Sequence, residues 1–223
     1  MRKITLAAAI AVSLAAIPSA QAGLIISGLQ SEYTPVPGAS LSDVRMEVDL
    51  WVAGGVATFT FTNVSLAPET TAVFKEIVID TYNDDTHTAY LTGPGTVIAP
   101  SGVAYTIGDS NGLPGFNSDT TDPHPLKELQ AVQPPPKNGI GIGQSVQVRF
   151  DTTLATGTTI YDYLALFNGP TDTLHGTFGF QAINCSVING QSLSGIEAPE
   201  PATIVLLMLG GLVVAFKRTR RRV

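Results

Sequence analysis

Short segments in which apolar and polar residues alternate recur along the middle of this chain, and they constrain its fold more than any other feature. Residues 44–50 read VRMEVDL and residues 56–62 read VATFTFT, and residues 74–79 and 145–150 repeat the pattern. Residues 164–167 and 177–187 are rich in aromatic and β-branched side chains. Because a period of two places successive side chains on opposite faces of a strand, these segments predict β-strands, several of them with one wet face.

Turn-forming residues separate these segments, and no amphipathic helix is evident between them. The turns are expected at residues 53–55 (AGG), 93–95 (GPG), 111–112 (NG) and 168–170 (NGP). Many short strands at such spacing favour an all-β domain, a single antiparallel β-sandwich of the jelly-roll or immunoglobulin-like kind. Residues 108–143 hold six prolines and little that could pair in a sheet, so we expect one long loop there.

The first 22 residues have the three parts of a secretory signal peptide. Arg2 and Lys3 are followed by an apolar run at residues 4–17, which is too short to span a bilayer comfortably. Pro18 then breaks the helix, and Ala20 and Ala22 form a small-residue cleavage site. We therefore expect export through the secretion translocon and cleavage by signal peptidase, with Gly23 as the mature N-terminus.

The last 27 residues, 197–223, form a second processing segment. Residues 202–216 are apolar and make a helix of roughly 22 Å, short for a hydrocarbon core of ~30 Å. Five cations follow this run and predict that it enters the membrane with its end in the cytoplasm and the central domain outside: Lys217, Arg218, Arg220, Arg221 and Arg222. Pro199 and Pro201 flank Glu200 and predict an extended backbone just before the helix.

This order of a Pro-Glu-Pro motif, a short apolar helix with the Gly210-Gly211 pair and a terminal arginine cluster resembles the PEP-CTERM sorting signal of Gram-negative-type bacteria. The resemblance covers residues 198–223 and departs from the usual pattern in one respect, since Ala202 precedes the expected small hydroxyl residue, Thr203. It implies recognition by an exosortase and cleavage near Pro199–Pro201. The precursor would be anchored in the inner membrane, and the product would reach the cell surface or the medium.

Residues 23–196 form the expected exported domain, and its charge excludes one class of partner. Five basic and sixteen acidic side chains give this segment a formal charge of −11. Such a surface repels phosphate backbones, so we expect no nucleic-acid partner. Cys185 is the single cysteine, which rules out an intrachain disulfide, and its apolar neighbours predict a buried strand thiol.

Two groups of acidic and amide side chains are weak candidates for calcium ligands. The first contains Asp80, Asn83, Asp84 and Asp85, and the second contains Asp109, Asn111, Asp119 and Asp122. Calcium takes six to eight oxygen ligands, but neither group has EF-hand spacing, and such residues are also ordinary in turns. The histidines are isolated and no G-x-S-x-G motif occurs, so we expect no zinc site and no serine nucleophile of that type.

We therefore expect a non-catalytic protein of the cell envelope or extracellular matrix, with exopolysaccharide as a potential partner. A secreted glycan hydrolase is the main alternative, because paired carboxyls leave no local signature. A calcium-dependent adhesion module and an ice-binding module are further alternatives. Trp51 with Tyr161 or Tyr163 offers aromatic rings for sugars, and Thr58, Thr60 and Thr62 form the threonine row that an ice-binding surface would need.

Overall fold

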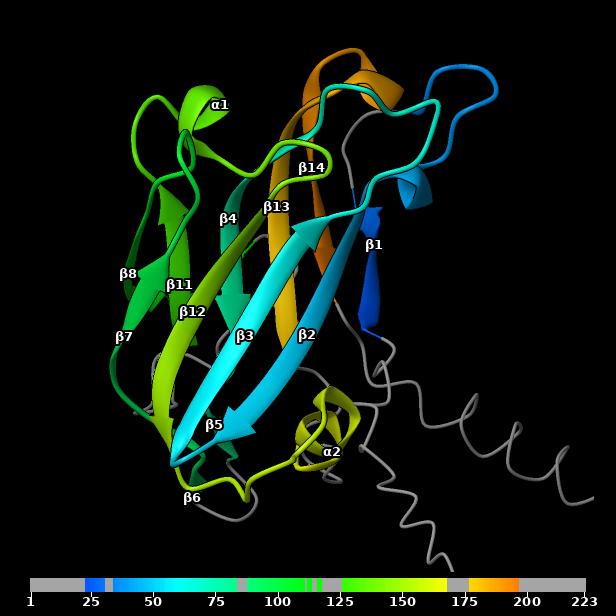
Figure 1. Cartoon of the computed structure of the whole chain (residues 1–223). Coiled ribbons are helices and arrows are strands. Elements are labelled where there is room, and N and C mark those ends of the chain that lie inside the picture. The colour runs from blue at the N-terminus through cyan, green and yellow to red at the C-terminus, as the bar shows by residue number, and fades with distance from the viewer. Residues whose placement is uncertain are drawn as a thin grey trace, which may run out of the picture.

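Ten strands form one continuous antiparallel sheet in the computed structural model, which describes residues 23–30, 34–83, 88–110, 112–113, 116–117, 126–167 and 177–196 (Figure 1). The strand order is β7-β12-β3-β2-β1-β14-β13-β4-β11-β8. Their bounds are β1 (Leu24–Gln30), β2 (Arg45–Ala53), β3 (Val56–Asn63), β4 (Val73–Ile79), β7 (Leu91–Ile98), β8 (Tyr105–Ser110), β11 (Leu126–Ala131), β12 (Ser145–Thr152), β13 (Phe178–Cys185) and β14 (Gln191–Ile196).

Smaller elements complete the fold. Two short strand pairs join β5 (Tyr82–Asn83) to β6 (Thr88–Ala89) and β9 (Gly112–Leu113) to β10 (Phe116–Asn117). The described helices are the 3-10 turns η1 (Leu41–Asp43) and η3 (Ser186–Ile188) and the short helices α1 (Pro135–Asn138) and α2 (Ile160–Ala165). None of these is long and apolar enough to cross a membrane. The predicted signal peptide and C-terminal helix lie outside the described residues.

Strand β1 makes the sheet continuous because its two halves pair with different neighbours. Its first half pairs with β2, with Leu24 opposite Val48, and its second half pairs with β14, with Gly28 opposite Gly195. Both glycines permit close packing at this change of partner. A Cβ atom on Gly28 would lie 2.6 Å from the Leu41 carbonyl oxygen, and one on Gly195 would lie 2.2 Å from the Phe180 ring.

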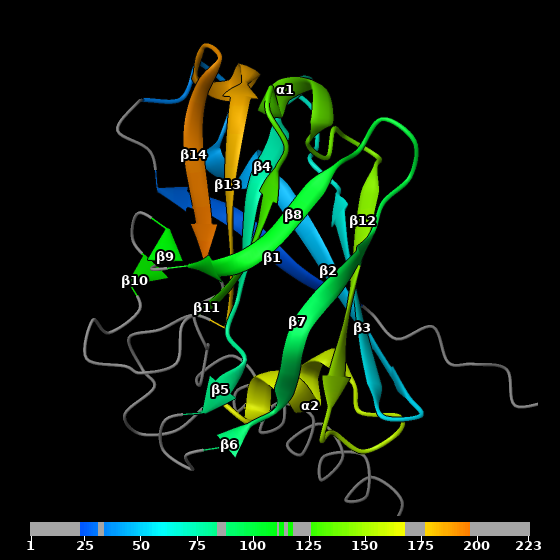
Figure 2. The ribbon, with the colours of Figure 1, turned by 90° about the vertical axis from the view of Figure 1, so that its left-hand side faces the viewer.

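The antiparallel all-β prediction is confirmed, but the strands do not form two separate sheets. Because β1 is shared, the sheet curls into a nearly closed barrel whose end strands are β7 and β8, which face the viewer in Figure 2. Side chains close this seam. At Gly95, with φ +76°, an added Cβ would lie 2.6 Å from Ile107 Cδ1 and 2.7 Å from Phe150 Cε1.

The core is built from the alternating residues that the sequence pattern identifies. Along β3, Phe59 and Phe61 are fully buried. The ring centroid of Phe59 lies 5.3 Å from that of Tyr163 and 5.8 Å from that of Phe178, so aromatic rings from β3, α2 and β13 meet in the barrel interior. Cys185 is buried as predicted, and burial together with the nearby Glu69 charge raises the pKa of its thiol to about 12.

A buried carboxylate fixes one end of the barrel. Burial alone would raise the pKa of Glu69, but hydrogen bonds outweigh it and lower that pKa. Glu69 Oε1 accepts from the backbone N–H groups of Thr71 (2.8 Å) and Ser186 (3.0 Å), among others, and Oε2 accepts from that of Val187 (3.1 Å). The carboxylate therefore ties the β3–β4 loop to η3, two segments more than a hundred residues apart in sequence.

Two local predictions are wrong. The expected loop at 108–143 contains β11, which pairs with β4 on one side and β8 on the other. Its sequence LKELQA has no strict alternation, and the prolines around it suggested a loop. The second error concerns residues 164–167, which were predicted as a strand. The structure instead has the end of α2 (Ile160–Ala165) at the start of this segment. A capping box begins this helix: the Thr159 side chain accepts from the Asp162 N–H, and the Asp162 side chain accepts from the Thr159 N–H.

Candidate functional site

The outward side chains of β2, β3, β12 and β7 form aligned rows, because these four strands lie next to one another in the sheet. In one row Trp51 is opposite Thr58, Thr58 is opposite Arg149, and Arg149 is opposite Thr96. We call these four residues the central row and the whole outward surface of the four strands the Trp51 face. The central row therefore carries an aromatic ring, two hydroxyls and a guanidinium across four strands.

Trp51 is the most exposed large apolar side chain of the described residues, at 63%. Its neighbours Leu50 and Val52 are buried, with 5% and 0% of their surfaces exposed, so the alternation of β2 directs the indole outward. The chain contains one tryptophan. Trp51 lies two residues before the end of β2, beyond Val48, the last residue of β2 that pairs with β1, so its exposed ring is free to stack on a ligand.

The rows on either side of the central row carry carboxylates. On one side, Asp49 lies opposite Thr60, and Gln147 Nε2 donates to Thr60 Oγ1 at 3.2 Å. On the other side, Asp151 lies opposite Val56 on β3 and Thr92 on β7. Burial raises the pKa of Asp49 above its usual value. The central row thus contains no acidic residue, whereas the rows on both sides of it contain one each.

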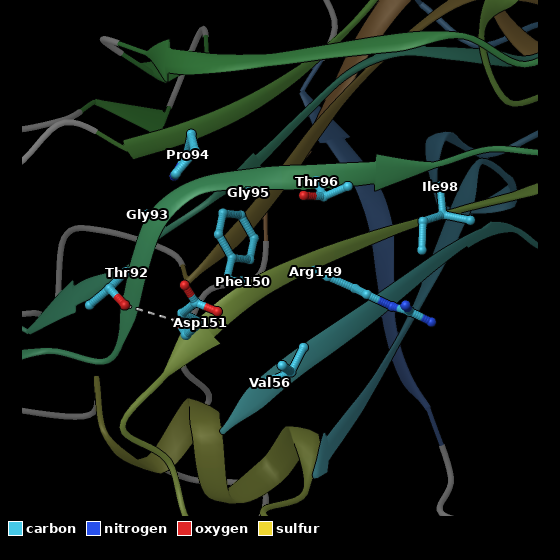
Figure 3. A pocket seen from close by; sticks show the side chains of 10 residues that line it. All are labelled: Val56, Thr92, Gly93, Pro94, Gly95, Thr96, Ile98, Arg149, Phe150 and Asp151. Atoms are coloured by element: carbon cyan, nitrogen blue, oxygen red, sulfur yellow. Dashed lines mark hydrogen bonds between the residues drawn. The ribbon is translucent and has the colours of Figure 1, made fainter. Parts of the chain in front are cut away.

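A bulge in β7 hollows the face next to Arg149. Arg149 and Asp151 are two positions apart on β12, whereas their partners Thr96 and Thr92 are four positions apart on β7. The extra residues include Gly93 and Gly95, whose φ angles of +78° and +76° suit glycine. The result is an open hollow of about 460 Å³ (Figure 3).

The side chain of Arg149 is exposed and makes no hydrogen bond or ion pair with any other described residue. Its position contrasts with those of three other basic side chains in the described part of the chain. Arg45 Nε donates to the Ser42 carbonyl at 2.7 Å, Lys75 lies 3.8 Å from a Glu76 carboxylate oxygen, and Lys127 pairs with Asp109. The Arg149 guanidinium, with five donors in a planar fork, is therefore available to a ligand.

The structure separates the two tyrosines that the sequence offered for sugar stacking. Tyr161 on α2 is 47% exposed and its hydroxyl lies 3.5 Å from the Gly23 carbonyl oxygen. Tyr163 is fully buried, and its hydroxyl donates to the Asp80 carbonyl. Tyr163 is therefore a core residue, and burial raises its pKa well above the usual value. Trp51, by contrast, is placed as a sugar-binding residue would need to be.

The described calcium candidates engage in local structure. Asp80 Oδ1 accepts from the Tyr82 N–H at 3.1 Å, Asn83 Nδ2 donates to the Leu166 carbonyl, and Asp109 pairs with Lys127. No group of three or more potential metal ligands is assembled in the part of the chain that the structure describes. Asp84, Asp85, Asn111, Asp119 and Asp122 lie outside it.

A pair of carboxyls on the other half of the barrel escaped the sequence analysis. Glu76 on β4 and Glu128 on β11 share a hydrogen bond, and burial, the Glu128 charge and that bond raise the pKa of Glu76 to about 7. The pair could not be found from sequence because β11 was not predicted as a strand. The alignment of Trp51 with Arg149 was missed for a related reason, since strand register joins residues almost a hundred positions apart.

Comparison with known proteins identifies the C-terminal segment. Residues 197–222 match the family model of the PEP-CTERM protein-sorting motif, as the resemblance predicted. The match includes Pro199, Glu200 and Pro201, which lie outside the described residues. This motif indicates an exported protein that an exosortase processes. No curated protein and no solved structure matches the chain, so the role of the barrel must be inferred from its own residues.

Proposed function

We propose that this chain is a non-catalytic protein of the cell envelope or extracellular matrix whose barrel binds exopolysaccharide through the Trp51 face. Residues 1–22 would direct the precursor to the translocon and signal peptidase. Residues 202–216 would hold it in the inner membrane with the barrel on the periplasmic side, until an exosortase acts near Pro199–Pro201. The observation that carries the binding proposal is the central row, in which an exposed indole is aligned with hydroxyls and a guanidinium.

These residue types suit a sugar polymer. A pyranose ring presents an apolar face of C–H groups and a rim of hydroxyls, so it needs a flat aromatic surface and nearby hydrogen-bond partners. Trp51 supplies the aromatic surface. Thr58 and Arg149, opposite each other on β3 and β12, supply donors beside it. Because the row extends over four strands, about 14 Å at the usual strand spacing, it could contact several units of a chain.

The spacing of the carboxyls supports binding without hydrolysis. Asp49 and Asp151 are two strands apart sideways and lie in rows on opposite sides of the central row. From standard strand spacing their backbones are roughly 16 Å apart, beyond the ~5–9.5 Å between the carboxyls of glycoside hydrolases. The Glu76 and Glu128 carboxyls lie on the other half of the barrel, away from the indole. They are hydrogen-bonded to each other, so they are closer together than the two carboxyls of a glycoside hydrolase.

The first test uses the processed protein recovered from cultures of its host and the extracellular polysaccharide of the same cultures. Because Trp51 is the single tryptophan, its fluorescence reports directly on the face in the wild type, and isothermal titration calorimetry measures binding by the Trp51→Ala variant, which lacks the indole. We expect saturable binding that Trp51→Ala weakens by roughly tenfold or more, as truncation of a central aromatic anchor does. Leu66→Ala is the matched control, since Leu66 is also exposed, at 46%, but lies on the β3–β4 loop.

The same samples distinguish the alternatives. Release of new reducing ends from the polysaccharide would support the glycan hydrolase instead. Binding that requires added calcium would support the adhesion module, with ligands from the acidic segments outside the described residues. Equal binding by the Trp51→Ala and Leu66→Ala variants would show that the Trp51 face is not the binding surface.

A further inference from the structure

We infer that the Trp51 face selects polysaccharide chains that carry carboxylates, as uronic acids do, and that Arg149 is the residue that recognises them. The inference rests on the proposed polysaccharide binding and adds the chemical class of the polymer. In this arrangement the chain lies across the strands along the central row. One sugar ring stacks on Trp51, and a carboxylate farther along the chain meets the Arg149 guanidinium.

The first argument is the state of Arg149. Its side chain projects from β12, between β3 and β7, and has no hydrogen-bond or ion-pair partner among the described residues, although acidic side chains outnumber basic ones in residues 23–196 by sixteen to five. Asp151, two positions along the same strand, forms no ion pair with the Arg149 guanidinium. An arginine binds a carboxylate through two parallel hydrogen bonds, a geometry that a neutral hydroxyl cannot reproduce.

The second argument is the arrangement of charge in rows. The central row contains no acid, whereas the neighbouring rows contain Asp49 on one side and Asp151 on the other. A polyanion that lay along the strands would bring its carboxylates close to these acids. One that lies across the strands keeps its charge over Thr58, Arg149 and Thr96. Arg149 therefore attracts an acidic chain, and repulsion by Asp49 and Asp151 in the flanking rows orients that chain across the strands.

The third argument is the space available at Arg149. Polar and apolar residues line the hollow beneath the β7 bulge, and Arg149, Thr96 and Asp151 are among them. In Figure 3 the Arg149 guanidinium extends toward Ile98, away from Asp151. Trp51 lies two strands from Arg149, roughly 10 Å at standard strand spacing, and does not line this hollow. A substituent that protrudes from a sugar ring, such as a carboxylate, therefore has room next to Arg149.

The test compares two polymers that share a backbone and differ at the carboxyl group: polygalacturonate, which is charged, and its methyl ester, which is neutral. The processed protein is titrated with each polymer by isothermal titration calorimetry, and Trp51 fluorescence is a second readout in every protein that keeps the indole. We expect polygalacturonate to bind roughly tenfold more tightly than the ester, the discrimination typical of a charge-assisted hydrogen-bonded pair. The difference in polygalacturonate affinity between the wild type and Arg149→Gln should shrink as salt rises from about 20 to 500 mM, because the contact is exposed. This comparison cancels most of the general repulsion that the formal charge of −11 on residues 23–196 exerts on a polyanion.

Four variants separate the contributions. Arg149→Gln should abolish the preference, because it weakens binding of polygalacturonate far more than binding of the ester. Arg149→Lys keeps the charge but lacks the planar fork, so it should retain part of the preference. Trp51→Ala should weaken both polymers equally. Lys137→Gln is the charge-matched control: Lys137 is an exposed cation on α1 whose side chain pairs with no other described residue, and its loss should change neither affinity.

The outcomes distinguish this inference from the proposed function. Equal affinity of the wild-type protein for both polymers, with both weakened by Trp51→Ala, would overturn acidic selectivity and leave polysaccharide binding intact. An equal loss of the preference in the Arg149→Gln and Lys137→Gln variants would show that net charge, and not this guanidinium, is responsible. Failure to bind either polymer would also overturn the inference, and failure to bind the host polysaccharide as well would overturn the proposed function.

Discussion

At the scale of single residues, Glu76 and Glu128 show how strand pairing creates a titrating group. Adjacent strands β4 and β11 bring the two carboxyls into hydrogen-bonding contact on a partly buried surface. Burial, the charge of Glu128 and the shared hydrogen bond raise the pKa of Glu76 to about 7, and Lys75 opposes the shift. One proton shared by the pair removes the repulsion that two adjacent charges would cause.

This pair predicts that the barrel loses stability as pH rises from about 4.5 to about 7. In that range folded Glu76 keeps its proton, whereas the unfolded carboxyl, with an ordinary pKa of 4.5, releases it. The native state then binds more protons, so the free energy of unfolding decreases with pH and levels off above pH 7. After allowance for solvent screening, we expect a contribution of about 1–2 kcal/mol.

Urea unfolding of the processed protein at pH 4.5, 6 and 8 measures this effect. Glu76→Gln should remove most of the decrease and should be more stable than the wild type at pH 8. Glu47→Gln, on the outer face of β2, is the control and should retain the decrease. If the free energy of unfolding of the Glu76→Gln variant decreased with pH as steeply as that of the wild type, the carboxyl pair would not govern the pH dependence.

At the scale of elements, the β7 bulge serves both the seam and the candidate site. Gly95 lets Ile107 of β8 and Phe150 of β12 pack against the backbone of β7, which closes the barrel. The same bulge opens the hollow next to Arg149. An ordinary strand at this position would have a side chain where those two residues now pack, so the seam would have to widen.

Gly95→Ala should therefore destabilise the protein by more than backbone strain alone. Gly55, in the β2–β3 turn, has the same φ of +76° but no atom within 4 Å of an added Cβ. Gly55→Ala isolates the cost of the conformation, about 1–3 kcal/mol. Gly95→Ala should cost about 1–3 kcal/mol more, because its methyl group meets Ile107 and Phe150 in a packed interior. Equal losses in urea unfolding would show that the seam tolerates the methyl group.

At the scale of the whole molecule, β1 decides that the strands make one barrel. It begins one residue after the predicted signal cleavage site, so cleavage before Gly23 leaves the strand complete. Leu24 and Ile26 are 9% and 2% exposed and contribute to the core. At the other terminus the last strand, β14, ends at Ile196, immediately before the segment that matches the sorting motif.

The two termini should therefore respond differently to truncation. Loss of residues 24–30 removes two buried apolar side chains, worth roughly 3–6 kcal/mol together, and leaves the edges of β2 and β14 unpaired. Since domains are stable by about 5–15 kcal/mol, this variant should unfold without a cooperative transition or at a much lower urea concentration. A variant that ends at Ile196 should unfold at the midpoint of the processed protein. A cooperative, wild-type-like transition in the first variant would show that β1 is dispensable.

The sequence by itself determined the properties that depend on neighbouring residues. Alternation directed Phe59 and Phe61 inward and Trp51 outward, and the apolar context of Cys185 predicted its burial. The sorting motif at 197–222 could likewise be recognised, because its parts follow one another in the chain. Such features need no tertiary information, since side-chain direction repeats every two residues along a strand.

The tertiary structure alone decided which strands are neighbours and in what register. It converted the two expected sheets into one barrel through β1, placed β11 between β4 and β8, and aligned Trp51 with Arg149 through Thr58. These pairings join segments far apart in sequence, and their energies depend on packing and on hydrogen bonds that no local pattern specifies. A binding face that crosses strands is therefore invisible until the register is known, because its members share a position in space and not in the chain.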